Sequence, residues 1–262
     1  MYRPSICTAC GTQYPAGKTP EVCPICADDR QYLPENGQHW TSHEELLQNY
    51  SVRILPLHER LYELTIAPTF AIGQRALLVL SDQGNILWDC IPLLNEPTRA
   101  FIESKGGLKA IAFSHPHYYS NVTDWAAAFD CPVHIHHRDA EWITQKDKRI
   151  QLWEGEEKAL WEGMRLHHIG GHFPGSSVLE APFLSKEGAL CCGDTLVLSP
   201  SKRHLSVMYS YPNRIPLPLS EMRRIQQRFE ALSFDAYYGY APGHNIIAGV
   251  KGLLKESMSR YC

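Results

Sequence analysis

Two histidines stand two residues apart, directly after the apolar run 111–113, where a strand would end. The imidazoles of His115 and His117 can point to the same side of an extended chain at this spacing and bind one metal ion. The next residues, Tyr119 and Ser120, offer a phenol and a hydroxyl, which are poor ligands for a divalent cation. The stretch can therefore be a metal site, half of a two-metal site, or only a loop that contains two histidines.

Three further candidate ligands follow apolar runs later in the chain. They are His172 in Gly-Gly-His-Phe-Pro-Gly, Asp194 in Cys-Gly-Asp-Thr and His244 in Ala-Pro-Gly-His. Loops that follow strands gather on one rim of a sheet, and they carry functional residues more often than the strands do. The neighbouring glycines let the backbone turn sharply and leave space around an ion. We therefore expect these loops to supply ligands at one rim.

The motifs H-x-H, G-H-x-P-G, G-D-T and P-G-H, in that order, resemble the metallo-β-lactamase superfamily over roughly residues 50–260. The resemblance implies an α/β fold, a four-layer αββα sandwich with metals at one edge. It also implies that His115, His117 and His172 form a first metal site. Asp194 would be the bridging carboxylate, and His244 would match the last ligand of a second site.

The sequence departs from the superfamily pattern H-x-H-x-D-H, because Tyr119 and Ser120 replace the ligands of the second metal. Only Asp194 and His244 remain for that position, so we expect one metal. Three neutral imidazoles can lower the pKa of zinc-bound water to about 7, and the metal-bound hydroxide would be the nucleophile. Asp194 would bind the metal or accept a hydrogen bond from the water. His244 would act as a general acid or substrate contact, and Tyr118 or Tyr119 would donate to a developing oxyanion.

A second metal site is predicted near the start of the chain. Two C-x-x-C pairs are separated by twelve residues, Cys7 with Cys10 and Cys23 with Cys26. Four thiolates at this spacing can close a tetrahedral shell, and the metal would replace the hydrophobic core that so short a segment lacks. Residues 1–40 resemble a zinc ribbon or rubredoxin-like knuckle, followed by a metallo-β-lactamase-like domain over 41–262. We favour structural zinc, although iron is possible at either site.

The composition indicates which kinds of molecule the protein is expected to bind. A net charge of −3 does not favour nucleic-acid binding. The sequence lacks both a run of about 18 apolar residues and the apolar core of a signal peptide, so no membrane association and a cytoplasmic location are expected. Nine cysteines then fit metal ligands and free thiols better than disulfides. The expected partner is a small-molecule substrate, and the oligomeric state is unknown.

Apolar periodicity predicts hairpins first and a mixture of strands and helices afterwards. A capped helix should begin within 41–45, and the turn 82–85 should link two strands. Residues 199–218, with four prolines, are predicted to be an irregular loop that can cover the substrate. Later helices are expected at 220–231 and 249–259. This order favours two sheets with helices outside.

The leading functional hypothesis is a metal-dependent hydrolase with a degenerate, mononuclear site. Its substrate would be a small ester, thioester, lactone or amide, since the fold does not fix the substrate. One alternative is a mononuclear iron oxidoreductase similar to persulfide dioxygenases, with His115, His172 and Asp194 as ligands. The other is a non-catalytic metal-binding module, favoured by the missing ligands of the second site.

Overall fold

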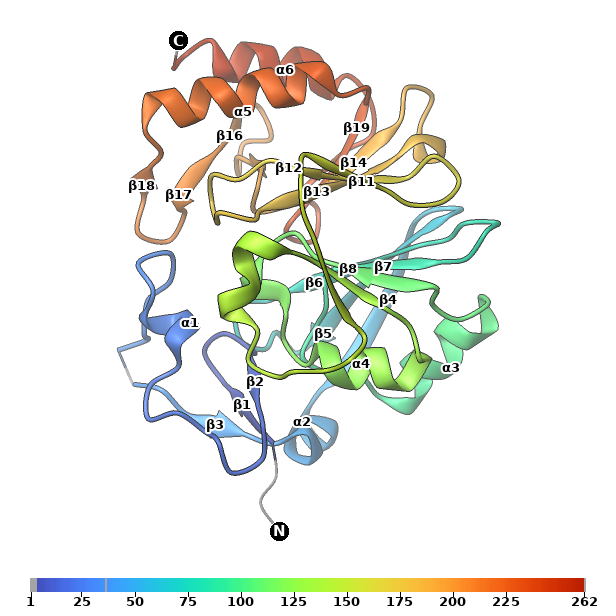
Figure 1. The fold of residues 1–262 in the computed structure, drawn as a ribbon, viewed down its shortest axis with the longest axis vertical. Helices are drawn as coiled ribbons and strands as arrows, with labels where there is room; N and C mark the ends of the chain where they lie inside the picture. The colour runs from blue at the N-terminus through green and yellow to red at the C-terminus, as the bar shows by residue number, and fades with distance from the viewer. Residues whose placement is uncertain (1–3, 36, 262) are drawn as a thin grey trace.

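The structure, a computed structural model, describes residues 4–35 and 37–261. Two sheets face each other at the centre, and helices cover the outer face of each (Figure 1). This is the four-layer αββα arrangement predicted from the sequence motifs, and it confirms the predicted fold class.

The first sheet runs in the order β10-β9-β8-β7-β6-β5-β4. Its strands are β4 Ser51–His58, β5 Leu61–Ala67, β6 Arg75–Val79, β7 Ile86–Trp88, β8 Ala110–Ala112, β9 Val133–His136 and β10 Ile150–Trp153. The second sheet runs in the order β11-β12-β13-β14-β19-β20. Its strands are β11 Glu157–Ala159, β12 Arg165–His168, β13 Ser177–Ala181, β14 Ala189–Gly193, β19 Ala236–Gly239 and β20 Asn245–Ile246.

The alternation of side chains along a strand builds the layers. In β6, Leu77 and Val79 belong to the apolar cluster between the sheets, while Ala76 and Leu78 belong to the cluster beneath the helices. Successive strand residues point to opposite faces, so a strand buried on both sides is apolar throughout. The helices that cover the first sheet are α3 Glu96–Ser104 and α4 Val122–Phe129, and those that cover the second are α5 Leu219–Ala231 and α6 Val250–Met258.

The predicted helix start within 41–45 is confirmed by α2, His43–Asn49. The Ser42 hydroxyl accepts the Glu45 N–H at 3.2 Å, and the Glu45 carboxylate accepts the Ser42 N–H at 3.1 Å. This reciprocal pair satisfies two donors at the helix start. The hairpin predicted at 82–85 is confirmed as well, since β6 and β7 pair antiparallel.

Other elements differ from the prediction. The edge strand β4 was missed, because its residues are half-buried or exposed and carry no continuous apolar signal. The stretch predicted as an irregular loop contains short strands, namely β16 Leu205–Ser206, β17 Met208–Ser210 and β18 Ile215–Pro216, and β15 Val197–Leu198 precedes it. Short 3-10 helices also occur, namely η1 Pro116–Tyr118, η2 His137–Trp142 and η3 Pro182–Leu184.

The N-terminal segment has a three-stranded sheet of its own and a short helix, and residues 4–35 and 37–41 are here called the cysteine knuckle. It contains β1 Ser5–Cys7, β2 Gln13–Tyr14, α1 Pro24–Ala27 and β3 Trp40–Thr41. The strands pair in the order β2-β1-β3, so the sheet continues one residue past the predicted boundary at residue 40. Within the described ranges, no helix is long and apolar enough to cross a membrane.

Arg75 forms a buried ion pair within the first sheet and hydrogen bonds to the second sheet. Arg75 of β6 donates to the Glu63 carboxylate at 2.7 Å, to the Gly239 carbonyl at 2.8 Å and to the Asn245 side chain at 2.9 Å. Replacing Arg75 with Met leaves a buried carboxylate without its partner, so we expect a loss of about 3–5 kcal/mol in unfolding free energy. Urea denaturation measures it. The control Arg99→Met breaks an exposed helical pair and should change stability by about 0.5 kcal/mol or less; equal losses would contradict the prediction.

Candidate metal centre

Four side chains from distant parts of the chain meet in one group, here called the His/Asp cluster. Its ligand atoms all lie within 4.8 Å of one another, and its members are His115, His117, His172 and Asp194. His172 Nε2 lies 3.4 Å from His117 Nδ1, and Asp194 Oδ2 lies 3.8 Å from the Nε2 atoms of His115 and His172. The structure thus brings together the four residues that the sequence analysis named for this site.

Both sheets contribute to the cluster. His115 follows β8 of the first sheet, and His117 lies in η1 one turn later. His172 follows β12, and Asp194 follows β14, both in the second sheet. The cluster therefore forms where strand ends of the two sheets meet at one edge of the sandwich.

Hydrogen bonds fix the orientation of two of the rings. Ser114 Oγ lies 2.9 Å from His115 Nδ1 and donates to the Asp89 carboxylate at 2.9 Å, so the ring N–H donates to the hydroxyl. His172 Nδ1 donates to the Tyr209 carbonyl at 2.8 Å. A ring that donates through Nδ1 carries its lone pair on Nε2, the atom that faces the cluster.

Burial sets the charge of the side chains. It lowers the pKa of His115 and His117 well below the usual value, and it lowers the pKa of His172 to about 4. The rings are therefore neutral, the form that binds metals. Burial also raises the pKa of Asp194 to about 7. A cation beside that carboxyl would favour its ionised form.

The donor set fits a divalent metal ion. Among the residues that the structure describes, His115 Nε2 and Asp194 Oδ1 are buried polar atoms without a hydrogen-bond partner. A buried polar atom without a partner lowers the stability of the folded protein unless a ligand or metal ion binds it. Ligands about 2.0–2.1 Å from zinc at the corners of a tetrahedron are about 3.3 Å apart. The 3.4 Å between His117 and His172 is close to that edge.

Steric contact with Ser114 requires a glycine at position 193, beside Asp194. Gly193 has φ +52°, and a Cβ atom there would overlap the Ser114 side chain. Ser114 is the residue that links His115 to Asp89. The glycine of the G-D-T motif therefore leaves room for the group that orients His115.

A cavity of about 410 Å³ opens onto Asp194. Three of its tyrosines come from the main body, and Tyr32 comes from the cysteine knuckle. The remaining wall combines three apolar residues with three polar or charged ones, and the full lining is Arg30, Gln31, Tyr32, Ile72, Tyr118, Asp194, Val197, Tyr211, Pro212 and Tyr240. This volume is typical of a small-molecule site.

The other predicted catalytic residues, Tyr119 and His244, are not in the lining of the cavity at Asp194. Tyr119 packs edge-on against Phe113 in the apolar core and does not line this cavity, whereas its neighbour Tyr118 does. Successive side chains of a turn point in different directions, which spacing alone did not resolve. His244 packs against the Tyr240 ring and lies outside the four-residue cluster found in the described part of the chain. The catalytic role of Tyr119 and the ligand or catalytic role of His244 stay predictions.

Several supporting residues were missed by the sequence analysis. Asp89 orients His115 through Ser114, and the Phe173 ring packs against three imidazoles at centroid distances of 4.9–5.6 Å. Arg30 of the knuckle donates to the His172 carbonyl across 142 positions of the chain. The only local signal was Phe173 itself, which adjoins His172. The other contacts depend on tertiary packing.

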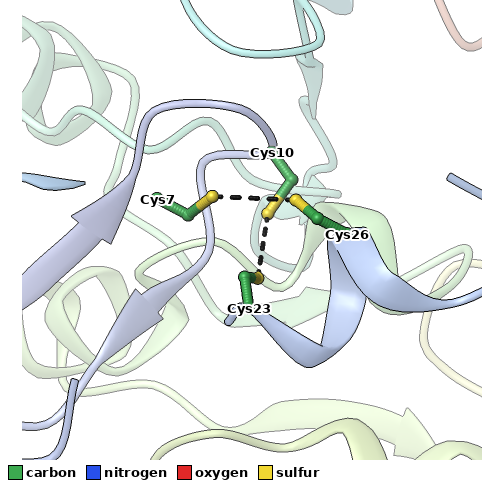
Figure 2. A group of neighbouring side chains, drawn as sticks. All are labelled: Cys7, Cys10, Cys23 and Cys26. Atoms are coloured by element: carbon green, nitrogen blue, oxygen red, sulfur yellow. Dashed lines mark hydrogen bonds between the residues drawn. The ribbon is translucent and has the colours of Figure 1, made fainter. Parts of the chain in front are cut away.

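The four cysteines of the knuckle form a second candidate metal site. Figure 2 shows their sulfurs pointing toward one another, with 3.7 Å between Cys7 and Cys26 and 3.6 Å between Cys10 and Cys23. Zinc–sulfur bonds of about 2.3 Å give tetrahedral edges of about 3.8 Å. Gln38 Nε2 donates to Cys7 Sγ at 3.0 Å, and the Tyr14 hydroxyl lies 3.1 Å from Cys23 Sγ. The geometry fits a thiolate-bound metal.

The chain is similar to known proteins in sequence and in fold. No family model matches the chain. "Uncharacterized protein YmaE" of Bacillus subtilis (strain 168) is 39% identical over 237 residues, which cover 89% of this chain and 86% of that protein.

Solved structures with the same fold include VMB-1, with a TM-score of 0.58 and 14% identity over 80% of this chain and 96% of that one. The metallo-β-lactamase FIM-1 from Pseudomonas aeruginosa in its mono-zinc form has a TM-score of 0.56 and 15% identity, over 80% and 94% of the two chains. TTHA1623 in a di-iron-bound form has a TM-score of 0.52 and 20% identity, over 70% and 92%. These likenesses confirm the predicted metallo-β-lactamase fold.

The two sites predict a metal content that can be counted. Elemental analysis of the purified protein should give two equivalents of divalent metal, one for each group of ligands. His117→Ala removes one imidazole of the cluster, so about one equivalent should remain, bound by thiolates. His58→Ala changes a histidine outside both groups and should leave two. An unchanged content in His117→Ala would contradict the assignment.

The space at Gly193 predicts a steric effect. Gly193→Ala combines a positive φ with an overlap at Ser114, so we expect a loss of about 2 kcal/mol or more in unfolding free energy. The matched control is Gly252→Ala in α6, where a Cβ meets nothing within 4 Å. That change should stabilise the protein by about 0.5–1 kcal/mol. Denaturant unfolding of both variants measures the difference, and a neutral Gly193→Ala would disprove the argument.

Proposed function

This chain belongs to the family of YmaE, and we propose that it is a metal-dependent hydrolase of a small, neutral ester, thioester, lactone or amide. The observation that carries the proposal is the His/Asp cluster, whose carboxylate Asp194 lines a cavity large enough for a small molecule. We further propose zinc as the metal at both sites, since imidazole and thiolate ligands suit it. The buried free thiols of the described cysteines favour a cytoplasmic location, which we also propose.

A divalent metal in the cluster would supply the Lewis acidity that activates water and polarises the bond under attack. Asp194 lines the cavity, and its Oδ1, which has no partner among the described residues, can accept a hydrogen bond and orient the attacking water. Tyr118 packs edge-on against His115 with ring centroids 5.0 Å apart, and its hydroxyl donates to the Tyr240 carbonyl at 3.1 Å. In this proposal the Tyr118 hydroxyl turns to donate to the oxygen that gains charge.

The residues of the site favour one metal ion in the His/Asp cluster. Tyr119 packs in the core, and the buried Ser120 hydroxyl has no hydrogen-bond partner among the described residues. His244 packs against Tyr240 and is not a member of the four-residue cluster found among the described residues. A second ion would then find no ligand set comparable to the first. The proposal is therefore a mononuclear site.

The cavity lining supports a neutral substrate with an apolar or aromatic group. Three tyrosines from the main body and Tyr32 from the knuckle provide most of the aromatic surface. The cation in the lining, Arg30, is already paired with Asp28 at 2.8 Å. A strongly anionic substrate would therefore lack a free positive side chain within the described lining.

Two alternative functions predict different experimental results. An iron oxidoreductase would need only His115, His172 and Asp194, whereas the structure also brings the third imidazole, His117, into the cluster. Oxygen uptake with a thiol substrate by iron-loaded protein would favour this alternative. A non-catalytic module would not need the cavity at Asp194, and it would be favoured by metal binding without any turnover.

A panel of chromogenic esters, thioesters and lactones tests the proposed reaction directly. Neutral substrates with an apolar acyl group should be hydrolysed with a kcat/KM at least about tenfold above that of matched anionic ones, because each 1.4 kcal/mol of lost contact costs about a factor of ten. His172→Ala should reduce the rate to background. Turnover that is unaffected by His172→Ala or by a chelator would contradict the proposal.

The adjacent tyrosines offer a matched pair of variants. Tyr118→Phe removes the hydroxyl proposed to stabilise the oxyanion, so kcat should fall by roughly 100-fold with little change in KM. Tyr119→Phe changes a tyrosine that packs in the core, and its kcat should be unchanged. Steady-state kinetics on the best substrate decides between them. Equal rates in both variants would remove Tyr118 from the mechanism.

A further inference from the structure

We propose that Arg30 of the cysteine knuckle is a positioning residue for the His/Asp cluster, so that the knuckle raises the metal affinity of that cluster. The inference rests on the proposed function only in that the cluster binds a divalent metal. It adds a coupling between two metal sites that lie in different parts of the fold.

Arg30 donates to the backbone of His172 and packs on Tyr209, the residue whose carbonyl accepts a hydrogen bond from the His172 ring. Its Nε donates to the His172 carbonyl, and its guanidinium carbon lies 4.3 Å from the centroid of the Tyr209 ring. The Tyr209 carbonyl in turn accepts the N–H of His172 Nδ1 at 2.8 Å. Both the backbone and the ring of His172 are therefore fixed by groups in contact with Arg30.

The same guanidinium also supports the ring on which the imidazoles pack. Its central carbon lies 4.3 Å from the centroid of Phe173. The Phe173 ring contacts all three histidines of the cluster, with centroids 5.6, 4.9 and 5.1 Å from those of His115, His117 and His172. Arg30 is 9% exposed, so these contacts are made in the interior, where stacking of a cation on aromatic rings is strongest. Movement of Arg30 would loosen the support of all three ligands.

The knuckle fixes the position of Arg30. Cys26 lies four residues earlier, at the end of the single-turn helix α1. Asp28 accepts two hydrogen bonds from Arg30 Nη1, at 2.8 and 2.9 Å, and one from its backbone N–H at 2.9 Å. On the main-body side, Asn213 donates to the carbonyls of Asp29 and Gln31 at 2.8 Å each. The metal bound by the cysteines would hold one end of this segment and Asn213 the other.

The other cysteine pair is tied to another ligand loop. Gln74 Nε2 donates to the Cys10 carbonyl at 2.5 Å and to the His117 carbonyl at 3.2 Å. One pair therefore reaches His117 through Gln74, and the other reaches His172 through Arg30. The cysteine knuckle is therefore joined to the His/Asp cluster by two independent connections, one at His117 and one at His172.

Groups that orient metal ligands without touching the metal typically change metal affinity by about 10- to 100-fold when they are removed. Because coupling between two binding sites is reciprocal, metal in the cluster should also strengthen metal binding by the knuckle. A short segment with little core of its own gains stability in this way.

The test uses the full-length protein loaded with Co²⁺, because thiolate ligands give Co²⁺ a charge-transfer absorption that imidazole and carboxylate ligands lack. Arg30→Met removes the charge and hydrogen bonds but keeps a long side chain between the two rings. The matched control is Arg60→Met: Arg60 also stacks on an aromatic ring, Phe183, donates through Nε to a backbone carbonyl and pairs with a carboxylate, all away from both sites. Arg30→Lys keeps the charge.

Titration with a chelator should remove Co²⁺ from the His/Asp cluster of Arg30→Met at a concentration about 10- to 100-fold lower than in the wild type. Arg60→Met should match the wild type, and Arg30→Lys should fall between. Excess Co²⁺ should restore the absorption of the cluster in Arg30→Met, and with it the kcat on an ester substrate, which a misfolded variant would not show.

Equal chelator resistance of Arg30→Met and wild type would overturn the inference and leave the proposed function standing. Co²⁺ bound only by thiolates in the wild type would overturn both. A release in Arg30→Met that excess Co²⁺ does not reverse would also overturn the inference, because it would show loss of fold rather than loss of positioning.

Discussion

The structure of the site depends on one constraint: His115 Nε2, His117 Nε2 and Asp194 Oδ1 are buried and have no hydrogen-bond partner among the described residues. Leaving such atoms unpaired costs free energy unless a cation completes them. The surroundings are arranged around this constraint. Ser114 and Asp89 fix the ring of His115, the Tyr209 carbonyl fixes that of His172, and Gly193 leaves the space that Ser114 needs. These contacts fix the directions of the Nε2 lone pairs of His115 and His172.

The two residues that depart from the superfamily pattern have structural roles of their own. Tyr119 packs against Phe113, and the carbonyl of Ser120 accepts the N–H of Gln13 in the knuckle at 3.1 Å. Ser120 also has φ +43°, a conformation in which a larger side chain is strained. The segment that would carry ligands of a second metal is thus used to attach the cysteine knuckle. The same segment therefore departs from the superfamily ligand pattern and contacts the cysteine knuckle.

The knuckle also changes what the fold can bind. Arg30, Gln31 and Tyr32 line the cavity above Asp194, so one wall of the candidate substrate site comes from outside the αββα sandwich. A shared fold therefore predicts little about the substrate here, because the relevant surface belongs to the added unit. The same segment contacts Phe173 and Tyr209, which connects the shape of the cavity to the geometry of the imidazoles.

The sequence by itself determined the residues that meet at the two candidate metal sites, the αββα fold class and the start of α2. The cysteine set, the pair His115 and His117, and the helix start follow from short-range patterns, namely C-x-x-C and H-x-H spacing and a capping box. The αββα class and the addition of His172 and Asp194 follow from the resemblance of the ordered motifs to the metallo-β-lactamase superfamily. Only the tertiary structure decided which of the adjacent tyrosines, Tyr118 or Tyr119, reaches the cavity, because side-chain direction in a turn depends on the packing around it. It likewise placed His244 beside Tyr240 and Arg30 beside His172. Such contacts join residues far apart in the chain, and no local pattern encodes them.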